Sequence, residues 1–247
     1  MTILRSESEK RKIREAGNIL SGVFDHLAKV ARSGVSTAFL DAEVEKIILE
    51  NDGEPAFKGY KGYPATICAS VNEVVVHGIP SEKIVLKDGD IVGIDIGVKK
   101  NGFFADAART YQIGGVSEQA MRLVEVTRMS LDAGIEKAVA GNRVSDISNA
   151  IEQVARKSGF KEVRAFVGHG IGKALHEQPE VPNWGGKGKG PVLKEGLLLA
   201  IEPMINLGDR EVRIMQDGWT AVTADEQLSA HFEDTVIVGK ERAEIIT

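Results

Sequence analysis

Two aspartates lie inside apolar stretches that a short turn separates. Asp95 stands in Ile94–Gly97, and Asp106 follows Gly102–Ala105. A carboxylate in an apolar strand is costly unless it is paired or bound to a cation. The turn allows two antiparallel strands to place both acids side by side. For one aspartate alone, an edge position or a local hydrogen bond is the better interpretation, whereas for two across one hairpin a shared cation is equally good.

Two histidines stand in a glycine-rich segment further along the chain. His169 lies between Gly168 and Gly170, and His176 follows in Leu175–Glu177. Glycines on both sides of a histidine allow a ligand to approach its ring closely. A lone histidine is more often a satisfied polar group than a ligand. Two histidines in a predicted glycine-rich turn favour a ligand role without deciding it.

Two glutamates stand at the borders of apolar runs. Glu202 ends the run Leu197–Ile201, and Glu233 precedes the strand-like stretch Thr235–Val238. Glu233 has an ordinary alternative, since it could simply pair with an arginine. Its neighbour Asp234 is interpreted as an ordinary solvated acid.

These residues together predict one site, composed of Asp95, Asp106, His169, Glu202 and Glu233. Carboxylates packed in one core repel each other strongly, and divalent metal ions cancel that repulsion. One imidazole and four carboxylates suffice for two ions only if some carboxylates bridge them, as in two-metal hydrolases with ions about 3.5–4 Å apart. Such a site makes hydroxide at neutral pH and polarises a carbonyl, which is the chemistry of amide hydrolysis.

The elements that must position this site occur in the same order twice. Apolar residues at helical spacing predict two pairs of helices, over Lys10–Arg32, from Ser36 or Thr37 to Glu50, over Ser117–Ala140 and over Ser145–Ser158. Strand-like stretches follow each pair, at Ala65–Val71, Ile91–Val98 and Gly102–Ile113, and then near Lys161–Val167, Gly196–Met204, Arg213–Thr223 and Ala230–Val238. Ser6 and Glu9 form a capping box before the first helix, Gly34 is its expected stop, and Lys99–Gly102 is a hairpin turn.

The repeated order predicts an α/β fold of the α+β kind. Two pseudo-symmetric halves, about 1–113 and 114–247, would share one sheet, although they show no clear residue-level identity. We expect one catalytic domain over 1–247. Trp184–Lys194 contains a run of glycines and lysines and is expected to be an exposed loop.

Composition excludes several classes of protein. The 247 residues are 43% hydrophobic and 27% charged, which argues against disorder and against a coiled coil. The net charge of −5 gives no general attraction to DNA or to anionic lipid. No apolar stretch is long enough to span a membrane, and Met1–Arg14 lacks the apolar region of a secretory signal. The single cysteine, Cys68, is compatible with a reducing cytosol and excludes a cysteine-rich zinc finger.

The motifs resemble those of the type I methionine aminopeptidases, in the pita-bread metallopeptidase superfamily. The resemblance covers nearly the whole chain, and its ordered motifs are together far more specific than any one of them. They are Gly59–Pro64, Ser70–Glu73 with His77–Pro80, Asp95 and Asp106, Gly168–Gly172 with His176 and Glu177, Glu202–Met204, and Glu233. The resemblance implies the pita-bread fold, with its mostly antiparallel curved sheet. It also implies removal of the initiator methionine from nascent proteins and peptides, with preference for a small second residue.

The resemblance also implies how the metal ions are held. Asp106 and Glu233 would bridge two divalent ions, Asp95 would hold one of them, and His169 with Glu202 would hold the other. Carboxylate-rich sites with one histidine accept Co, Mn, Fe or Zn, so the native metal stays open.

Catalytic roles follow from the same resemblance. A water between the ions would be the nucleophile, with Glu202 as its proton acceptor. His176 would stabilise the tetrahedral oxyanion, and His77 would contact the substrate backbone or the leaving amine.

The resemblance places the methionine pocket among Tyr60, Tyr63, Cys68 and Trp219. Cys68 is then a small apolar wall residue and not a nucleophile, and an ordinary buried cysteine would be equally inert. Asn72 and Ser229 match positions that hold a monovalent cation in some relatives.

Three departures from the family pattern concern the surroundings of the site. Lys61 stands where relatives often have histidine, Phe104-Ala105 replaces a common His-Gly before Asp106, and Leu175 stands where some relatives have phenylalanine. They put the pocket shape and the metal preference in doubt, not the chemistry.

Two alternatives have different functions on the same fold. A prolidase or an aminopeptidase P would usually carry a large extra N-terminal domain. A non-catalytic binding protein would typically have lost ligands, and all five are present here. Without eukaryotic-type extensions or the insertion of type II enzymes, we expect a bacterial-type, cytoplasmic monomer.

The expected partners are N-terminal Met peptides and nascent chains. The exposed loop carries Lys187, Lys189 and Lys194, which would allow transient contact with ribosomal RNA. A solvated loop is the better interpretation of these lysines.

Overall fold

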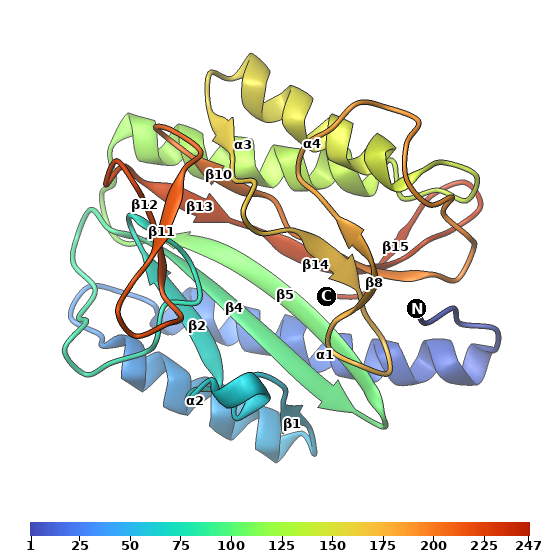
Figure 1. Ribbon diagram of the computed structural model, residues 1–247. Coiled ribbons are helices and arrows are strands. Elements are labelled where there is room, and N and C mark those ends of the chain that lie inside the picture. The colour runs from blue at the N-terminus through green and yellow to red at the C-terminus, as the bar shows by residue number, and fades with distance from the viewer.

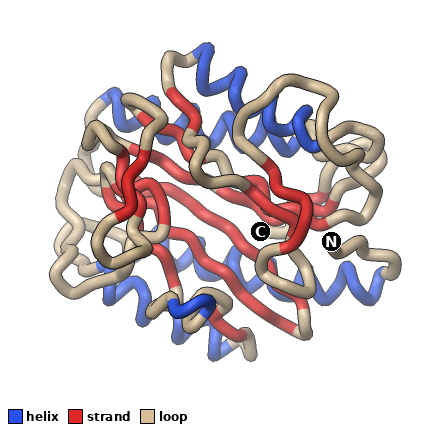
Figure 2. The backbone as a smooth tube through the Cα atoms, in the orientation of Figure 1, coloured by secondary structure: helices blue, strands red, loops and turns tan.

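The computed structural model describes residues 1–247 and places two pairs of helices on either side of a central set of strands (Figure 1). The first pair is α1 (Glu7–Val30) and α2 (Thr37–Glu50), and the second is α3 (Glu118–Ile135) and α4 (Val144–Lys157). Figure 2 shows the strands running through the middle, with one helix pair below them and the other above in this view. None of the helices combines the length and apolarity that crossing a membrane requires.

The strands are numbered along the chain as β1 (Glu54–Pro55), β2 (Ile67–Val71), β3 (Val74–Val76), β4 (Ile91–Lys100), β5 (Phe103–Gln112), β6 (Lys161–Glu162), β7 (Gly168–Gly170), β8 (Glu177–Val181), β9 (Leu198–Ile201), β10 (Met204–Asn206), β11 (Val212–Ile214), β12 (Ala221–Thr223), β13 (Ser229–His231), β14 (Glu233–Ile237) and β15 (Glu244–Ile245). The main sheet has the order β1-β4-β5-β14-β9-β7-β8, with β2 paired to β4 and β15 to β14. Two three-stranded sheets, β13-β10-β6 and β11-β12-β3, complete the fold. All these strand pairs are antiparallel, and the two halves meet where β5 pairs with β14.

Helix α1 has the predicted capping box, but it begins at Glu7, directly after Ser6, and not at the predicted Lys10. The Ser6 hydroxyl accepts from the Glu9 N–H at 3.2 Å, and the Glu9 carboxylate accepts from the Ser6 N–H at 3.3 Å, so the capping box is present. The helix ends at Val30, slightly before the predicted Arg32, and Gly34 follows with φ +87°. Its buried face packs on β4 and β5.

Each helix pair covers its own core. One cluster joins α1 and α2 to β2, β4 and β5, and the other joins α3 and α4 to β9, β13 and β14. The predicted pair of halves around a shared sheet is therefore confirmed, whereas the extent of the domain stays a prediction.

The strands of the second half are shorter and more broken than predicted. The stretch Gly196–Met204 divides at Glu202-Pro203 into β9 and β10, and Ala230–Val238 divides at Phe232 into β13 and β14. In both cases the chain passes between the main sheet and a small sheet. The predicted strand Arg213–Thr223 is instead the hairpin of β11 and β12. The residues on both sides of each break are buried, so apolar character does not mark the passages, although Pro203, which cannot donate to a strand ladder, is a local sign of the first one.

Candidate functional site

The hairpin of β4 and β5 places two carboxylates on one face of the main sheet. Asp95 pairs with Ala108, and Asp106 pairs with Gly97, so the two acids are diagonal neighbours across the strands. The two-residue turn Asn101-Gly102 has positive φ at both positions, which fixes this register. The sequence therefore predicted correctly that the hairpin brings both aspartates together.

Strand β14 adds Glu233 to the same face. Ala108 pairs with Asp95 on one side and with Glu233 on the other, so these three residues form one row across three strands. The Thr235 hydroxyl accepts from the Asp106 N–H at 2.9 Å and donates to the Asp106 carbonyl at 2.8 Å. This double hydrogen bond fixes the junction of the two halves beside the carboxylates.

His169 lies on strand β7, not in the glycine-rich turn that the sequence indicated. A Cβ on Gly168 would lie 2.5 Å from the Ala200 carbonyl oxygen, and one on Gly170 would lie 2.2 Å from the Gln178 carbonyl oxygen. The glycines are therefore required by close strand packing and not by the approach of a ligand. The His169 Nδ1 lies 2.9 Å from the Gly170 carbonyl, which assigns the proton to Nδ1 and leaves the Nε2 lone pair free.

Glu202 lies at the break between β9 and β10. Its Oε1 is 3.5 Å from the His169 Nε2. The side chain of Asn183, which is buried, donates to the Glu202 carbonyl at 3.1 Å and so supports the break. Asn183 was not predicted as a site residue, because nothing near it in the sequence marks it as a support for a residue so far along the chain.

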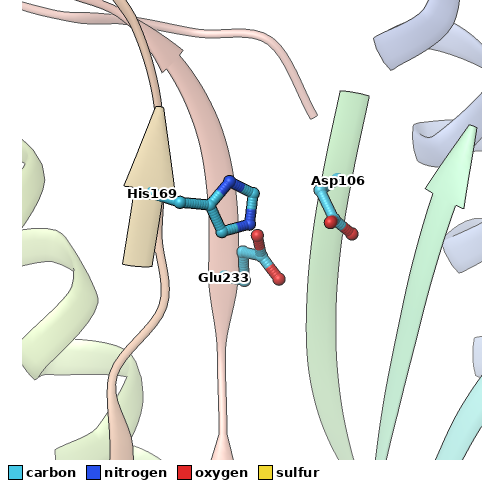
Figure 3. Close-up of side chains that lie close together, drawn as sticks. All are labelled: Asp106, His169 and Glu233. Carbon is cyan, nitrogen blue, oxygen red and sulfur yellow. The ribbon is translucent and has the colours of Figure 1, made fainter. Parts of the chain in front are cut away.

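The side chains converge on one point of the sheet. Figure 3 shows Asp106 of β5, His169 of β7 and Glu233 of β14 lying close together, and one ligand-type atom from each lies within 4.8 Å of the others. Asp95 and Glu202 line the same cavity.

The carboxylates of this cluster fit a divalent metal centre. Asp95 Oδ1, Asp106 Oδ1 and Glu233 Oε1 are buried and have no hydrogen-bond partner. Burial raises the pKa of Asp106 to about 7, and burial together with the neighbouring carboxylates raises the pKa values of Asp95, Glu202 and Glu233 well above their ordinary values. Such a cluster is unfavourable as four anions and becomes favourable around cations. Oxygen ligands with one imidazole are a donor set that several divalent metals accept.

Two histidines lie at the rim of the cavity. The His176 ring lies 4.2 Å from the His169 ring and places its Nδ1 3.0 Å from the Tyr60 hydroxyl. His77 has a left-handed backbone with φ +60°, a conformation that is strained for a residue other than glycine, and its ring packs edge-on against Phe166. Burial lowers the pKa values of both histidines, and His169 and Lys61 lower that of His176 further. Both imidazoles are therefore neutral at pH 7.

An apolar pocket opens beside the carboxylates. The cavity has a volume of about 170 Å³, and Trp219 packs edge-on against Tyr63 at 5.1 Å between ring centroids. Cys68 pairs with Asp95 across β2 and β4, so the pocket wall adjoins the cluster directly. Burial raises the pKa of the Cys68 thiol, which keeps it protonated. The cavity is lined on this side by Phe57, Tyr60, Lys61, Tyr63, Cys68, Leu175 and Trp219.

All eleven of the predicted catalytic, metal-binding and pocket residues thus lie around one cavity. Of the three departures, Lys61 and Leu175 line it, whereas Phe104 lies outside its lining. The residues predicted for a monovalent cation, Asn72 and Ser229, are also neighbours, and the Ser229 N–H donates to the Asn72 carbonyl at 2.9 Å.

Comparison with known proteins identifies the family. The profile of metallopeptidase family M24 matches residues 11–240. The chain belongs to this family. It is 50% identical to a methionine aminopeptidase of Clostridium perfringens over all of this chain and 99% of that protein, and 45% identical to methionine aminopeptidase 1 of Bacillus subtilis over the same shares.

Solved structures confirm the pita-bread fold of this M24 protein. A methionine aminopeptidase of Thermotoga maritima has a TM-score of 0.97 at 42% identity and covers 100% of this chain and 99% of that one. A prolidase of Pyrococcus furiosus has a TM-score of 0.79 at 23% identity, and the match covers 99% of this chain and 65% of that chain. The likeness to the prolidase concerns the fold alone.

The interpretation of Asp234 as a solvated acid is wrong. Its side chain is 1% exposed and forms an ion pair with Arg109, whose guanidinium also donates to the Glu233 carbonyl. The ordinary alternative for Glu233 was an ion pair between its carboxylate and an arginine. Arg109 instead binds the backbone carbonyl of Glu233 and the carboxylate of Asp234. The sequence around Asp234 does not reveal this burial, because Asp234 follows Glu233 directly and strand alternation points it to the other face of the sheet.

Two further residues of the site were not identified from the sequence. Phe57 lines the apolar pocket, and no pattern around it indicated this. His231 is 3% exposed and lies 3.8 Å from the second oxygen of Glu202. A signal existed for His231, since a residue two positions before Glu233 shares its face in an extended chain.

Proposed function

We propose that this M24 metallopeptidase removes N-terminal methionine from peptides and nascent proteins. The observation that carries the proposal is the position of an apolar pocket directly beside a cluster of buried carboxylates. Methionine suits such a pocket, because its unbranched thioether fills irregular apolar space and makes favourable contacts with aromatic rings such as Tyr63 and Trp219. The names of the relatives support the same activity.

The carboxylates and one imidazole would hold two divalent ions. Asp106 and Glu233, on the adjacent strands β5 and β14, would be ligands to both ions, as the resemblance implies. Asp95 would also bind one of the ions, and His169 together with Glu202 would bind the other. Bound ions of this kind polarise a carbonyl and lower the pKa of water.

The remaining residues bind the peptide and move protons. Glu202 accepts the proton of the attacking water, since one of its oxygens faces away from His169. His176 stabilises the negative charge that develops on the carbonyl oxygen, and the Tyr60 hydroxyl holds its ring in place. His77 contacts the substrate backbone or the leaving amine, because Trp219 and Phe166 fix its ring at the rim.

We also propose where the enzyme acts, its oligomeric state, its preference at the second substrate residue and a monovalent cation site. We expect a cytoplasmic monomer that prefers a small second residue in its substrate, and a monovalent cation near Asn72 and Ser229. Lys187, Lys189 and Lys194 are exposed on the loop after Trp184, where contact with ribosomal RNA is the weaker alternative to simple solvation.

The test is peptide hydrolysis by protein that is stripped of metal and reloaded with Mn²⁺ or Co²⁺. The substrates are Met-Ala-Ser, Met-Lys-Ser, Leu-Ala-Ser and Ala-Pro-Ser. We expect metal-dependent release of methionine from Met-Ala-Ser alone. His169→Ala should lower the rate by about 10³-fold or more, because a metal ligand supports several kcal/mol of transition-state stabilisation.

His26→Ala is the matched control, since His26 pairs with Glu43 between α1 and α2. This variant should keep full activity. Cleavage of Ala-Pro-Ser instead of Met-Ala-Ser would assign the protein to a different specificity. No cleavage with any metal would favour a non-catalytic binding protein.

A further inference from the structure

His231 is a buried imidazole to which the proposed function gives no role. Its side chain is 3% exposed, and its Nε2 has no hydrogen-bond partner. An unpaired buried polar group of this kind costs about 1–3 kcal/mol. Since such groups are rare in folded proteins, this one requires an explanation.

The position of His231 is fixed independently of the carboxylate cluster. It ends β13 and pairs with Met204 of β10. Its N–H donates to the Thr110 hydroxyl at 3.0 Å, and that hydroxyl donates to the His231 carbonyl at 2.7 Å. Strands β5 and β10 thus hold the backbone from two sides, and the ring projects from a rigid base.

Glu202 lies between two imidazoles. Its Oε1 is 3.5 Å from the Nε2 of His169, and its Oε2 is 3.8 Å from the Nε2 of His231. Neither separation is a hydrogen bond, but a shift of less than 1 Å would make one with His231. Glu202 occupies the two-residue link between β9 and β10, so its carboxylate lacks the support that a regular strand gives its residues.

We propose that His231 is a positioning residue for Glu202, and this proposal rests on the proposed function. The His231 Nε2–H donates to Oε2 of Glu202 and so keeps Oε1 turned toward the metal ion that His169 holds. The hydrogen bond occupies one lone pair of Oε2 and leaves the other free to accept the proton of water. A metal ion bound between His231 and Glu202 would instead occupy the oxygen that the proton needs.

The alternative is that His231 is itself a metal ligand. Glu202, His231 and Glu233 each place one potential ligand atom within 4.8 Å of the other two, which is close enough for a shared ion. The two roles differ in chemistry, since a glutamine amide donates a hydrogen bond but is a poor replacement for an imidazole on a transition metal.

The experiment compares His231→Gln with His231→Asn, whose amide is one methylene shorter and does not reach Glu202. Mn²⁺ is titrated into each metal-free protein by calorimetry without substrate, and kcat and KM are measured on Met-Ala-Ser. We expect His231→Asn to weaken Mn²⁺ binding and to lower kcat by about 10–100-fold, the usual effect of losing a residue that orients a metal ligand. Its KM should change less than about threefold. His231→Gln should restore both quantities to within about fivefold of the unaltered protein.

Two results would overturn the proposal. If His231→Gln is as impaired as His231→Asn and binds one Mn²⁺ fewer than the unaltered protein, His231 is a ligand. If both variants match the unaltered protein in calorimetry and in kcat, His231 only fills the core. Because the calorimetry needs no substrate, it judges His231 even if Met-Ala-Ser is not cleaved, an outcome that would count against the proposed function alone. Thermal unfolding of each variant checks that it is folded.

Discussion

The two halves of the molecule supply the site in different ways. The first half places Asp95 and Asp106 on one regular hairpin, whose strands β4 and β5 pair over their whole length. The second half places Glu202 and Glu233 at the points where the chain passes between two sheets. A regular ladder holds its side chains through backbone pairing, whereas a break must be held by side chains. The breaks of the second half therefore depend on buried polar side-chain contacts more than the regular hairpin of β4 and β5 does.

These contacts are specific. Arg109 binds the Glu233 carbonyl and the Asp234 carboxylate, and Asn183 binds the Glu202 carbonyl. We therefore predict that removing a polar support lowers the free energy of unfolding or the metal affinity more in the second half than in the first.

The largest effect is expected at the ion pair beside Glu233. Asp234→Asn leaves the guanidinium of Arg109 without its buried partner, and removing one member of such a pair costs about 3–5 kcal/mol. The measurement is urea unfolding of the metal-free protein. In the double variant Arg109→Met with Asp234→Leu, most of this loss should be absent, because no charge is then left buried and unpaired.

A pair in the first half is the control. Lys99 and Glu54 lie 2.8 Å apart near the end of β4, but Glu54 is largely exposed. Glu54→Gln should therefore cost less than about 1 kcal/mol. Equal losses at the two pairs would contradict the difference between the halves.

The second prediction concerns Asn183 and the break at Glu202. Asn183→Leu leaves the Glu202 carbonyl unpaired and frees the break, so Mn²⁺ affinity should fall by about 10–100-fold. Calorimetric titration of Mn²⁺ into metal-free protein measures this fall.

Asp41 offers the matched change in the first half. Its carboxylate accepts from the Thr66 and Ile67 N–H groups, both at 2.9 Å, where β2 begins. Asp41→Ala should lower the free energy of unfolding by about 1–3 kcal/mol. Its Mn²⁺ affinity should stay within about threefold, since β4 still holds Asp95. A larger loss of affinity in Asp41→Ala than in Asn183→Leu would reverse the comparison.

The same difference explains what the sequence could reveal. Alternating and continuous apolar runs predict the long hairpin and its turn, and helical spacing with a capping box predicts the helices, because these are local patterns. The passages between sheets are not local. They depend on which surface each short strand meets, and the apolar residues on either side of a break do not reveal this.

For the candidate site, chemistry predicted more than periodicity did. Carboxylates and histidines in apolar surroundings are conspicuous in a sequence, since each is costly to bury alone. Their supports are not conspicuous. Asn183 and Asp234 are ordinary polar residues until the fold buries them, and His231 shows its importance only through its distance to Glu202.

The smallest change in the free energy of unfolding, counted per pH unit and per titrating group, is expected from the pH dependence of the metal-free protein. The pKa of Asp106 is about 7 in the folded chain, above the ordinary 3.8 of an unfolded aspartate. Between these values the folded state binds more protons at Asp106 than the unfolded state does, so this carboxylate makes the free energy of unfolding fall as the pH rises. His77 and His176, whose pKa values are lowered in the folded state, act in the opposite direction where the unfolded histidines bind protons. The slope is at most about 1.4 kcal/mol per pH unit for each such group.

Urea unfolding at pH 5, 6 and 7 measures this slope, and Mn²⁺ should flatten it by stabilising the deprotonated carboxylates. Asp106→Asn in the first half and Glu233→Gln in the second should each reduce the slope by a similar amount, because both acids belong to one buried cluster and burial raises the pKa of both. The two halves should therefore contribute equally to the pH dependence of the free energy of unfolding, since the carboxylate cluster is shared and only its supporting contacts differ. Variants whose slopes equal that of the unaltered protein would show that the carboxylates do not titrate as one buried cluster, and a changed slope in only one of the two variants would assign the titration to one half.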